Sequence, residues 1–276
     1  MFYFFNFTFL YGFSAFIYSS SGFINRLIRS LYPNETGAIV SALVLGDKTK
    51  ISEETRTLFS LSGTAHLLAV SGFHIGIIAS VVFLLLGFIR NRWSKFTVFT
   101  VLLGLFVVIS GSQPSAIRAG IMAELVLITV MLERRIIGLN IVALTLVVVM
   151  LFSPKIIYSP GFQMSAASIM GISILFAPFR RSLQVLLPLS SWFGELIIAS
   201  FAVTFAASTM VSPIVAYYFS IFSLVSPITN LLIIPLMGIA MIWVFCSLCF
   251  VPINWGIALT FASASSTCIY VVELIN

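Results

Sequence analysis

Residues 224–250 read LVSPITNLLIIPLMGIAMIWVFCSLCF, and this stretch contains no charged side chain. It belongs to a longer uncharged run that extends from residue 196 to residue 272. Of the 276 residues, 60% are hydrophobic and 8% are charged, whereas an ordinary soluble domain is roughly a quarter charged. This composition excludes a water-soluble globule. Because lipid offers backbone groups no hydrogen-bond partners, we expect an all-α integral membrane protein.

The uncharged windows predict a polytopic helical bundle of about nine spans, since a helix needs about 20 apolar residues to cross the hydrocarbon core. The predicted spans are 2–18, 65–89, 96–112, 115–133, 139–153, 161–179, 192–215, 224–250 and 254–274. Pro227 and Pro235 could divide the eighth span into a re-entrant pair. The first span lacks a basic n-region. We therefore expect an uncleaved apolar anchor over residues 1–25, ahead of a membrane domain over residues 26–276.

Basic residues follow the second, fourth and sixth predicted spans, and these three turns lie on one side of the membrane. They are Arg90, Arg92 and Lys95, then Arg134 and Arg135, then Arg180 and Arg181. The positive-inside rule makes that side cytoplasmic. The stretch 19–64 then lies outside, and its net charge of only +1 predicts no strong anion-binding surface.

Two short amphipathic helices are expected on the outer surface within this stretch. The run TGAIVSALVLG at residues 36–46 is apolar on most sides but too short to span. Ser52 is placed to cap a second helix, in which Glu53 and Glu54 favour the positive end of the helix dipole.

The two histidines of the chain both lie in TAHLLAVSGFHIG, residues 64–76. We expect His66 at the outer end of the second span and His74 deeper, on the same helix face as Ser71. Gly72 and Gly76 form a GxxxG step, which lets another helix approach closely. An interhelical hydrogen bond is the ordinary role of such buried polar side chains.

Arg118 and Glu124 are charged residues within the fourth predicted span, where charge is costly and often marks a functional or paired site. Arg118 lies near the outer end, so it either snorkels to the headgroups or forms part of a site. Glu124 and His74 lie at similar depth in their spans, which predicts a contact between them.

Most of the polar residues within the predicted spans lie in the outer half of the membrane. They are His66, Ser71, Arg118, Gln163 and Asn230. This distribution predicts a polar vestibule that opens to the exterior and narrows toward His74.

Several chemistries are not supported by the sequence. Cys246 and Cys249 form a CxxC within an apolar run, and only Cys268 accompanies them, whereas a structural zinc site uses four Cys or His ligands. No GxxxxGK[ST] motif for nucleotide phosphates is present. We expect no metal, no cofactor and no catalytic residues, and hence a protein that is not an enzyme.

The string LVLGDKTKISEETRTLFSLSGTAHLLAVSGFHIG at residues 43–76 resembles the signature of the ComEC-type competence family. The matching positions are Leu45, Gly46, Asp47, Gly63, His66, Leu67, Leu68, Ala69, Ser71, Gly72, His74 and Gly76. Three later strings resemble further family segments in the same order: PSAIRAGIM at 114–122 with Arg118, SPGFQMS at 159–165 with Pro160, Gly161 and Gln163, and SPITNLLIIPLMG at 226–238 with Asn230 and Pro235. The resemblance assigns no counterpart to Glu124.

The resemblance implies a multi-pass channel in the bacterial inner membrane that conducts one strand of transforming DNA inward. It also implies an exterior DNA-receptor protein and a cytoplasmic helicase-type motor as partners, besides single-stranded DNA and membrane lipid. An OB-like domain before residue 26 and a nuclease domain after the last span belong to the family pattern. We therefore expect this chain to be the membrane core, with a nuclease encoded separately; the GxxxG step permits a homodimer.

Three other functions stay open on the sequence. The first is a remnant or split-gene product, because of the missing domains. The second is a permease for a small anion with Arg118 as its ligand. The third is an intramembrane enzyme built on Ser71 and His74, which would need the hydroxyl aimed at an imidazole nitrogen.

Overall fold

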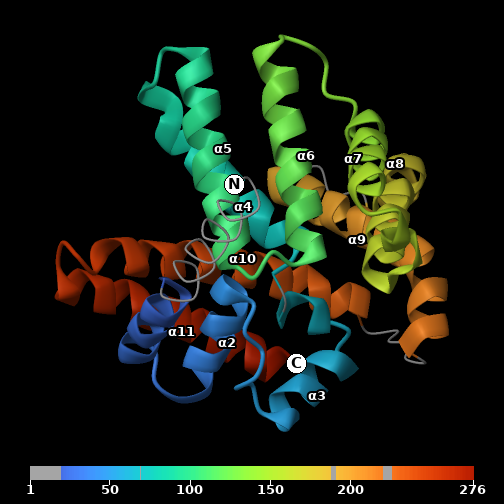
Figure 1. Cartoon of the computed structure of the whole chain (residues 1–276). Helices are drawn as coiled ribbons and strands as arrows, with labels where there is room; N and C mark the ends of the chain where they lie inside the picture. The colour runs from blue at the N-terminus through green and yellow to red at the C-terminus, as the bar shows by residue number, and fades with distance from the viewer. Residues whose placement is uncertain (1–19, 69, 188–190, 220–225) are drawn as a thin grey trace.

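The computed structural model describes residues 20–68, 70–187, 191–219 and 226–276, and every regular element in these ranges is a helix (Figure 1). A helical segment over residues 20–31 comes first. The elements after it are α2 (Asn34–Leu45), α3 (Glu53–Leu61), η1 (Ala65–Leu68), α4 (Gly72–Leu85), η2 (Leu86–Phe88), α5 (Arg92–Ile109), α6 (Pro114–Met131), α7 (Gly138–Phe152), η3 (Pro154–Tyr158), α8 (Pro160–Leu186), α9 (Trp192–Phe219), α10 (Ser226–Phe250) and α11 (Trp255–Ile275). The predicted anchor span 2–18 lies outside the described residues.

Six of the described helices, α5, α6 and α8–α11, are long and apolar enough to cross a membrane. This confirms a multi-pass membrane protein, but it does not confirm the predicted count of nine spans. α4 has 14 residues and α7 has 15, so each is only about 21–23 Å long. The predicted second span, 65–89, is interrupted, because residues 65–68 form a 3₁₀ turn and the α-helix begins only at Gly72.

The eighth predicted span is one helix in the described chain, and the alternative of a re-entrant pair divided at its prolines is not observed. α10 runs from Ser226 to Phe250 through Pro235. α8 and α9 likewise contain Pro178 and Pro213. Proline is tolerated inside membrane helices because neighbouring groups satisfy the carbonyl that it frees.

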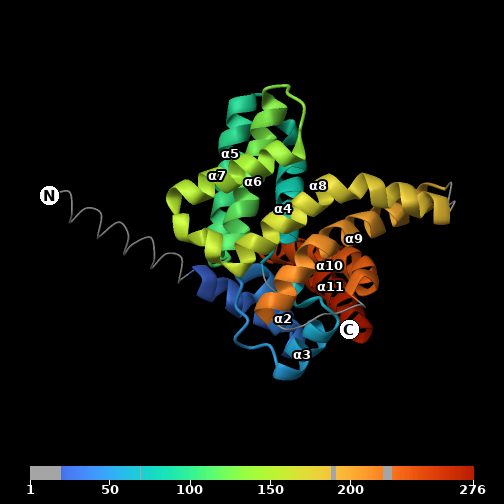
Figure 2. The ribbon, with the colours of Figure 1, turned by 90° about the vertical axis from the view of Figure 1, so that its right-hand side faces the viewer.

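Three helical hairpins project from a common base in different directions (Figures 1 and 2). α5 and α6 form the upright hairpin, with α4 beside them. α8 pairs with α9, where Gly171 lets the helices approach at the Ala206 carbonyl. α10 pairs with α11, where the rings of Trp243 and Phe261 stack with centroids 5.2 Å apart. The chain therefore forms splayed hairpins rather than the single bundle that was expected.

α2 lies within this base and not on the outer surface, which corrects the expectation of an interfacial helix. All residues from Gly37 to Leu45 are buried. A helix that is apolar all round is stable only where its whole circumference is covered. Just before α2, the hydroxyls of Tyr32 and Ser265 lie 2.9 Å apart, which ties this segment to α11.

α3 has the predicted cap and is the more exposed of the two short helices. The Ser52 Oγ accepts a hydrogen bond from the Thr55 N–H at 3.2 Å. Phe59 is buried against the core, whereas Leu58 and Leu61 are exposed. The predicted surface position therefore holds for this helix.

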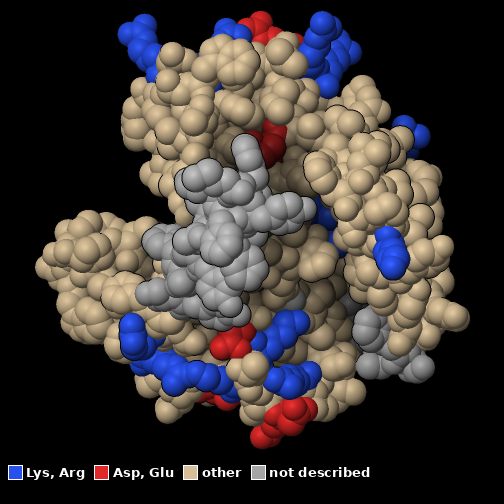
Figure 3. Space-filling model, viewed as in Figure 1, with Lys and Arg blue, Asp and Glu red and all other residues tan. Residues whose placement is uncertain are grey.

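The first two basic clusters lie together at the tip of the upright hairpin, as the positive-inside rule requires. Arg92 lies 3.7 Å from the Glu133 carboxylate, and its Nη1 donates to the Met131 carbonyl at 3.1 Å. Figure 3 shows Lys and Arg at this tip and again, mixed with acidic residues, over the base. Arg180 and Arg181 lie near the tip of the α8–α9 hairpin, which points elsewhere (Figure 2).

Gly46 ends α2 in a conformation that only glycine adopts without strain. Its φ is +73°, its N–H donates to the Ala42 carbonyl at 3.1 Å, and a Cβ there would lie 2.8 Å from the Ser110 carbonyl oxygen. We predict that Gly46→Ala lowers the free energy of unfolding by at least about 1–2 kcal/mol, the cost of the left-handed conformation. Thermal unfolding of the purified protein in detergent measures this.

Gly104 of α5 provides the matched control, because a Cβ there would contact nothing within 4 Å in the part of the chain that the structure describes. Gly104→Ala is expected to leave stability unchanged or to raise it, since alanine favours the helix. Equal losses in the two variants would contradict the role given to Gly46.

Candidate functional site

The N-terminal end of α6 is fixed by a proline and a serine from the string PSAIRAGIM. Pro114 occupies the first turn, where its missing N–H costs nothing. The Ser115 hydroxyl donates to the Val70 carbonyl at 2.7 Å, which anchors the helix end to the turn before α4. Gln113 precedes the helix and its Nε2 donates to the Gly46 carbonyl at 3.4 Å.

The N-terminal end of α8 is built in the same way from the string SPGFQMS. Ser159 is the cap, and its hydroxyl accepts from the Phe162 N–H at 3.3 Å. Pro160 follows in the first turn. The Gln163 Nε2 donates to the Ile157 carbonyl at 3.0 Å, which closes the chain back onto η3.

Arg118 of α6 joins these two helix ends. Its Nη2 donates to the Gly161 carbonyl at 2.9 Å, and its guanidinium carbon lies 5.9 Å from the centre of the Phe162 ring. The residue is only 3% exposed. Its Nε and Nη1 are buried and have no hydrogen-bond partner within the described chain. Arg118 therefore does not snorkel to solvent. It is a buried cation, and two of its nitrogens can donate further hydrogen bonds.

The loop after α2 brings further charge to the same place. Asp47 Oδ1 accepts from the Thr49 N–H at 3.0 Å and from the Thr49 hydroxyl at 2.6 Å, which fixes the loop as an Asx turn. Arg56 of α3 donates to the Lys48 carbonyl and pairs with the Glu53 carboxylate at 3.0 Å. Asp47 thus shapes the loop that presents Lys48.

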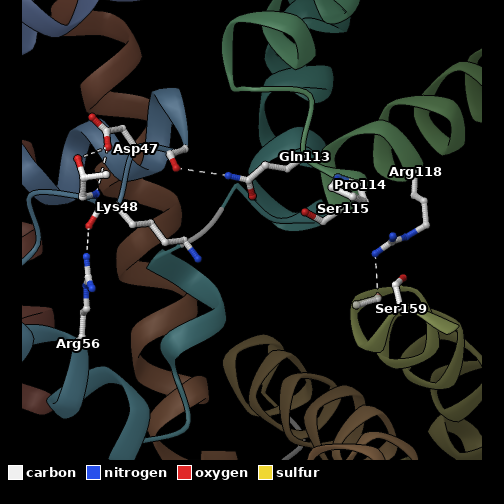
Figure 4. A pocket seen from close by; sticks show the side chains of 11 residues that line it. Asp47, Lys48, Arg56, Gln113, Pro114, Ser115, Arg118 and Ser159 are labelled. Atoms are coloured by element: carbon white, nitrogen blue, oxygen red, sulfur yellow. Dashed lines mark hydrogen bonds between the residues drawn. The ribbon is translucent and has the colours of Figure 1, made fainter. Parts of the chain in front are cut away.

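These segments enclose a cavity of about 600 Å³, which we call the Arg118 cavity. It is lined by Gly46, Asp47, Lys48, Thr49, Arg56, Gln113, Pro114, Ser115, Arg118, Ser159 and Gly161. In Figure 4, Lys48 and Arg118 extend toward it from opposite sides, with Gln113 and Ser115 between them. Residues that are up to 115 positions apart in the sequence thus form one site.

The Arg118 cavity is cationic and suited to an anion with several oxygens. Three of its side chains, Lys48, Arg56 and Arg118, are positive, and Asp47 is the one acid in its lining. Two helix N-termini, with their positive dipole ends, open into it. Partial desolvation lowers the pKa of the Lys48 ammonium, and the positive charge of Arg56 lowers it further. A phosphate group supplies the negative charge and the acceptors that this lining lacks.

Of the predicted vestibule residues, only Arg118 lines the cavity, together with the motif residues Gly46, Asp47 and Gly161. Ser71 and His74 instead form the start of α4. The Ser71 N–H donates to His74 Nδ1 at 3.1 Å, and the Ser71 hydroxyl lies 3.2 Å from the same nitrogen, so His74 acts as the return partner of a helix cap. His74 is fully buried.

The predicted contact between Glu124 and His74 is wrong. The Glu124 carboxylate accepts from the Thr100 hydroxyl at 2.9 Å, so it faces α5 rather than α4. The prediction compared only the depth of the two residues in their spans, whereas the direction of each side chain around its helix decides the partner.

The other predicted polar residues lie outside the cavity. His66 is exposed in η1. Asn230 is buried in the first turns of α10, next to Thr229, whose hydroxyl donates to the Ser62 carbonyl at 2.9 Å. Gly63 has a φ of +77° in the turn that this bond holds. Neither His66 nor Asn230 is among the residues that line the Arg118 cavity.

Within the described chain, only one glycine of the GxxxG step lies against another helix. A Cβ on Gly72 would lie 3.6 Å from the Ala119 Cβ, so this glycine contacts α6. A Cβ on Gly76 would meet no atom of the described residues within 4 Å. Pro235 lies within α10.

Lys48, Arg56 and Gln113 were missed as site residues in the sequence. The net charge of +1 over residues 19–64 predicted no strong anion-binding surface, yet Lys48 and Arg56 of this stretch line the Arg118 cavity. Arg118, which lies outside that stretch, joins Lys48 and Arg56 in the lining. The acidic residues Glu35 and Glu54 of the stretch do not line the cavity. The only sequence signal was the position of Lys48 and Gln113 beside the LGD and PSAIR strings.

Comparison with known proteins places these segments in one family. Residues 43–275 match the family model described as competence protein. The chain is 31% identical to ComE operon protein 3 of Bacillus subtilis (strain 168) over 212 residues, which make up 75% of this chain and 25% of that protein. It is 25% identical to the uncharacterized protein YcaI of Escherichia coli (strain K12) over 78% of this chain and 29% of that protein.

An uncharacterized protein of Aquifex aeolicus (strain VF5) is 27% identical over 70% of this chain and 48% of its own length. The chain thus spans about a quarter to a half of these relatives. No solved structure matches it. The matched residues include α2's end, the Arg118 cavity and all six long helices. The chain therefore belongs to the competence protein family.

Proposed function

We propose that this chain is the membrane channel core through which single-stranded DNA crosses the bacterial inner membrane during competence. We further propose that the Arg118 cavity receives the backbone phosphates of the incoming strand. Family membership supports a role in competence. The observation that carries the site is the buried Arg118 guanidinium, two of whose nitrogens have no partner among the described residues, in a cavity that also contains Lys48 and Arg56.

The chemistry of the cavity fits a phosphodiester. Guanidinium groups bind phosphate oxygens through paired N–H donors, and lysine adds a compact positive charge. The Arg118 side chain is already ordered by its bond to the Gly161 carbonyl, so little of its rotamer freedom remains to be lost on binding. Such contacts do not depend on base identity, as DNA uptake of arbitrary sequence requires.

The position of the cavity fits the outer opening of a channel. Arg118 lies near the start of α6, whereas Arg134 and Arg135 follow the other end of that helix. If this basic end is cytoplasmic by the positive-inside rule, the cavity faces the exterior. Weak contacts at several places let a strand be captured and still move on.

We also propose that the chain is not an enzyme. The Ser71–His74 pair satisfies the hydrogen-bond distance for a nucleophile and its base. However, His74 Nδ1 already accepts the Ser71 backbone N–H, and the histidine is fully buried. The cap at the start of α4 accounts for both residues without catalysis.

A small-anion permease is the second candidate, because the Arg118 cavity offers the same donors to any oxyanion. On the channel proposal, an exterior DNA receptor, a cytoplasmic motor, a nuclease and a second copy of this chain are the proposed partners.

Arg118→Ala is expected to lower transformation frequency in the source organism by at least about tenfold, while the protein still inserts in the membrane. A hydrogen bond to a charged group contributes about 1.5–3 kcal/mol, so each phosphate passing the cavity loses that stabilisation. Counting transformants per viable cell, with an immunoblot of the membrane fraction, measures both effects.

Lys155→Ala is the matched control, because it removes a cation in η3 close to α8 but outside the cavity lining. It is expected to leave transformation unchanged. Normal transformation in the Arg118 variant would contradict the channel proposal, and loss of phosphate or sulfate uptake instead would favour the permease.

The depressed pKa of Lys48 gives the cavity a pH dependence. Below that pKa the ammonium is charged and binds an anion, and the charge is lost as the pH rises through it. We predict that affinity for a labelled dinucleotide falls at a pH below that at which an ordinary lysine, with a pKa of about 10.4, loses its proton. Fluorescence anisotropy between pH 7 and pH 10 tests this.

Lys48→Arg keeps the positive charge over this range and should bind the dinucleotide with an affinity that hardly changes with pH. If the wild type and Lys48→Arg show the same decline, the titrating group is not Lys48 and the assignment of Lys48 to the site is wrong.

A further inference from the structure

A second cavity, of about 420 Å³, lies at the opposite end of α2 from the Arg118 cavity. We call it the Ser41 cavity. It is lined by Asn25, Arg29, Tyr32, Pro33, Asn34, Gly37, Ala38, Ser41 and Lys50. The Arg118 cavity meets α2 at its C-terminal Gly46, whereas the Ser41 cavity extends along α2 from its start at Asn34 to Ser41.

The Ser41 cavity contains a buried hydroxyl group with no partner. Ser41 is only 2% exposed, and its Oγ has no hydrogen-bond partner within the described chain. The start of α2 adds backbone N–H groups, because Pro33 precedes the helix and no side chain caps it. This hydroxyl and the first-turn N–H groups of α2 line one cavity, where each can donate to a bound acceptor.

The charge of this cavity is positive. Arg29 and Lys50 line it, and no acidic residue does. Arg29 Nε donates to Asn25 Oδ1 at 3.3 Å, which holds the guanidinium at the rim. The nearby Glu35 carboxylate accepts from the Ser52 N–H at 2.9 Å. An anion is the acceptor that matches this charge, and phosphate is an anion that two basic side chains and a helix N-terminus can bind together.

The two cavities are held at a fixed separation by α2 and by the loop that returns beside it. α2 has twelve residues, so its ends are about 18 Å apart. This loop returns to the start of α2, because the Ser52 N–H that follows it donates to the Glu35 carboxylate in the first turn of the helix. Lys48 and Lys50 of this one loop line the Arg118 cavity and the Ser41 cavity, respectively.

We infer that the Ser41 cavity is a second phosphate site, which holds the same DNA strand as the Arg118 cavity at a point several nucleotides away. This inference rests on the proposed function. At about 3.4 Å per nucleotide in a stacked strand, 18 Å corresponds to about five nucleotides. Two cationic cavities lie on one rigid, buried helix. This arrangement favours one DNA strand that reaches both cavities, rather than a separate lipid headgroup in each.

Oligonucleotide length separates the two sites. A dinucleotide is too short to reach both cavities, whereas an oligothymidylate of about 12 nucleotides is about twice as long as the 18 Å separation. The experiment measures the affinity of both labelled probes by fluorescence anisotropy for the full chain in phosphatidylcholine nanodiscs. The test variant is Arg29→Ala/Lys50→Ala, and the control with the same charge change, Arg26→Ala/Lys155→Ala, removes cations that line neither cavity.

The test variant is expected to bind the longer probe about tenfold more weakly than the control does, and the dinucleotide equally well. The slope of log affinity against log salt for the longer probe should fall by about 0.7 for each lost phosphate contact. Equal affinities of test and control for the longer probe would overturn the second site. A second result would also overturn it: the test variant loses copurified phosphatidylglycerol, counted by native mass spectrometry, while its oligonucleotide affinity is unchanged. The cavity would then hold a lipid phosphate.

Failure of the proposed function has a different signature. If the wild type binds neither probe, or if Arg118→Ala binds both as tightly as the wild type does, the Arg118 cavity is not a phosphate site. If the wild type binds both probes and Arg118→Ala weakens both, the proposed function stands whatever the test variant shows.

Discussion

Arg118 reaches from the second turn of α6 to the Gly161 carbonyl in the first turn of α8, and this one hydrogen bond holds two helix ends at the same cavity. The guanidinium is taken out of water to form it, and an incompletely paired buried charge is costly. Two of its nitrogens stay without partners within the described chain. The cost is reduced when an anion occupies the cavity, so the fold favours anion binding at this point.

The motif residues around Arg118 serve this arrangement by shaping chain ends rather than by contacting a ligand. Pro114 and Pro160 each occupy a first helical turn, and Gly46 ends α2 in the left-handed conformation. Asp47 fixes the loop that carries Lys48. A channel that passes a flexible polyanion needs its cations in fixed places, because ordering them at the moment of binding would cost conformational entropy.

Much of the helical architecture could be predicted from composition, because uncharged runs and their charged ends are local features. The predicted spans at 96–112, 115–133, 161–179, 192–215, 224–250 and 254–274 correspond to the six long helices. α4 was predicted too long because the Ser71–His74 cap, and not hydrophobicity, sets its start. α2 was placed on the surface because its sequence cannot reveal what covers it.

The candidate site was predictable only in part. Arg118 was identified, since a charge within an apolar run is visible in the sequence. Its neighbour Lys48 lies 70 positions away and is brought close by tertiary packing, which no local pattern encodes. The same limit explains Glu124, whose partner is Thr100 of the adjacent helix.

The most direct test is to ask whether DNA in transit passes the Arg118 cavity. A photo-crosslinking amino acid in place of Gln113, which lines the cavity, would be activated while competent cells take up labelled DNA. The same amino acid in place of Tyr270, exposed on α11, serves as the control. The channel account predicts labelled single-stranded DNA attached at position 113 and not at position 270. Uptake that proceeds normally with no adduct at position 113 above the control would contradict it.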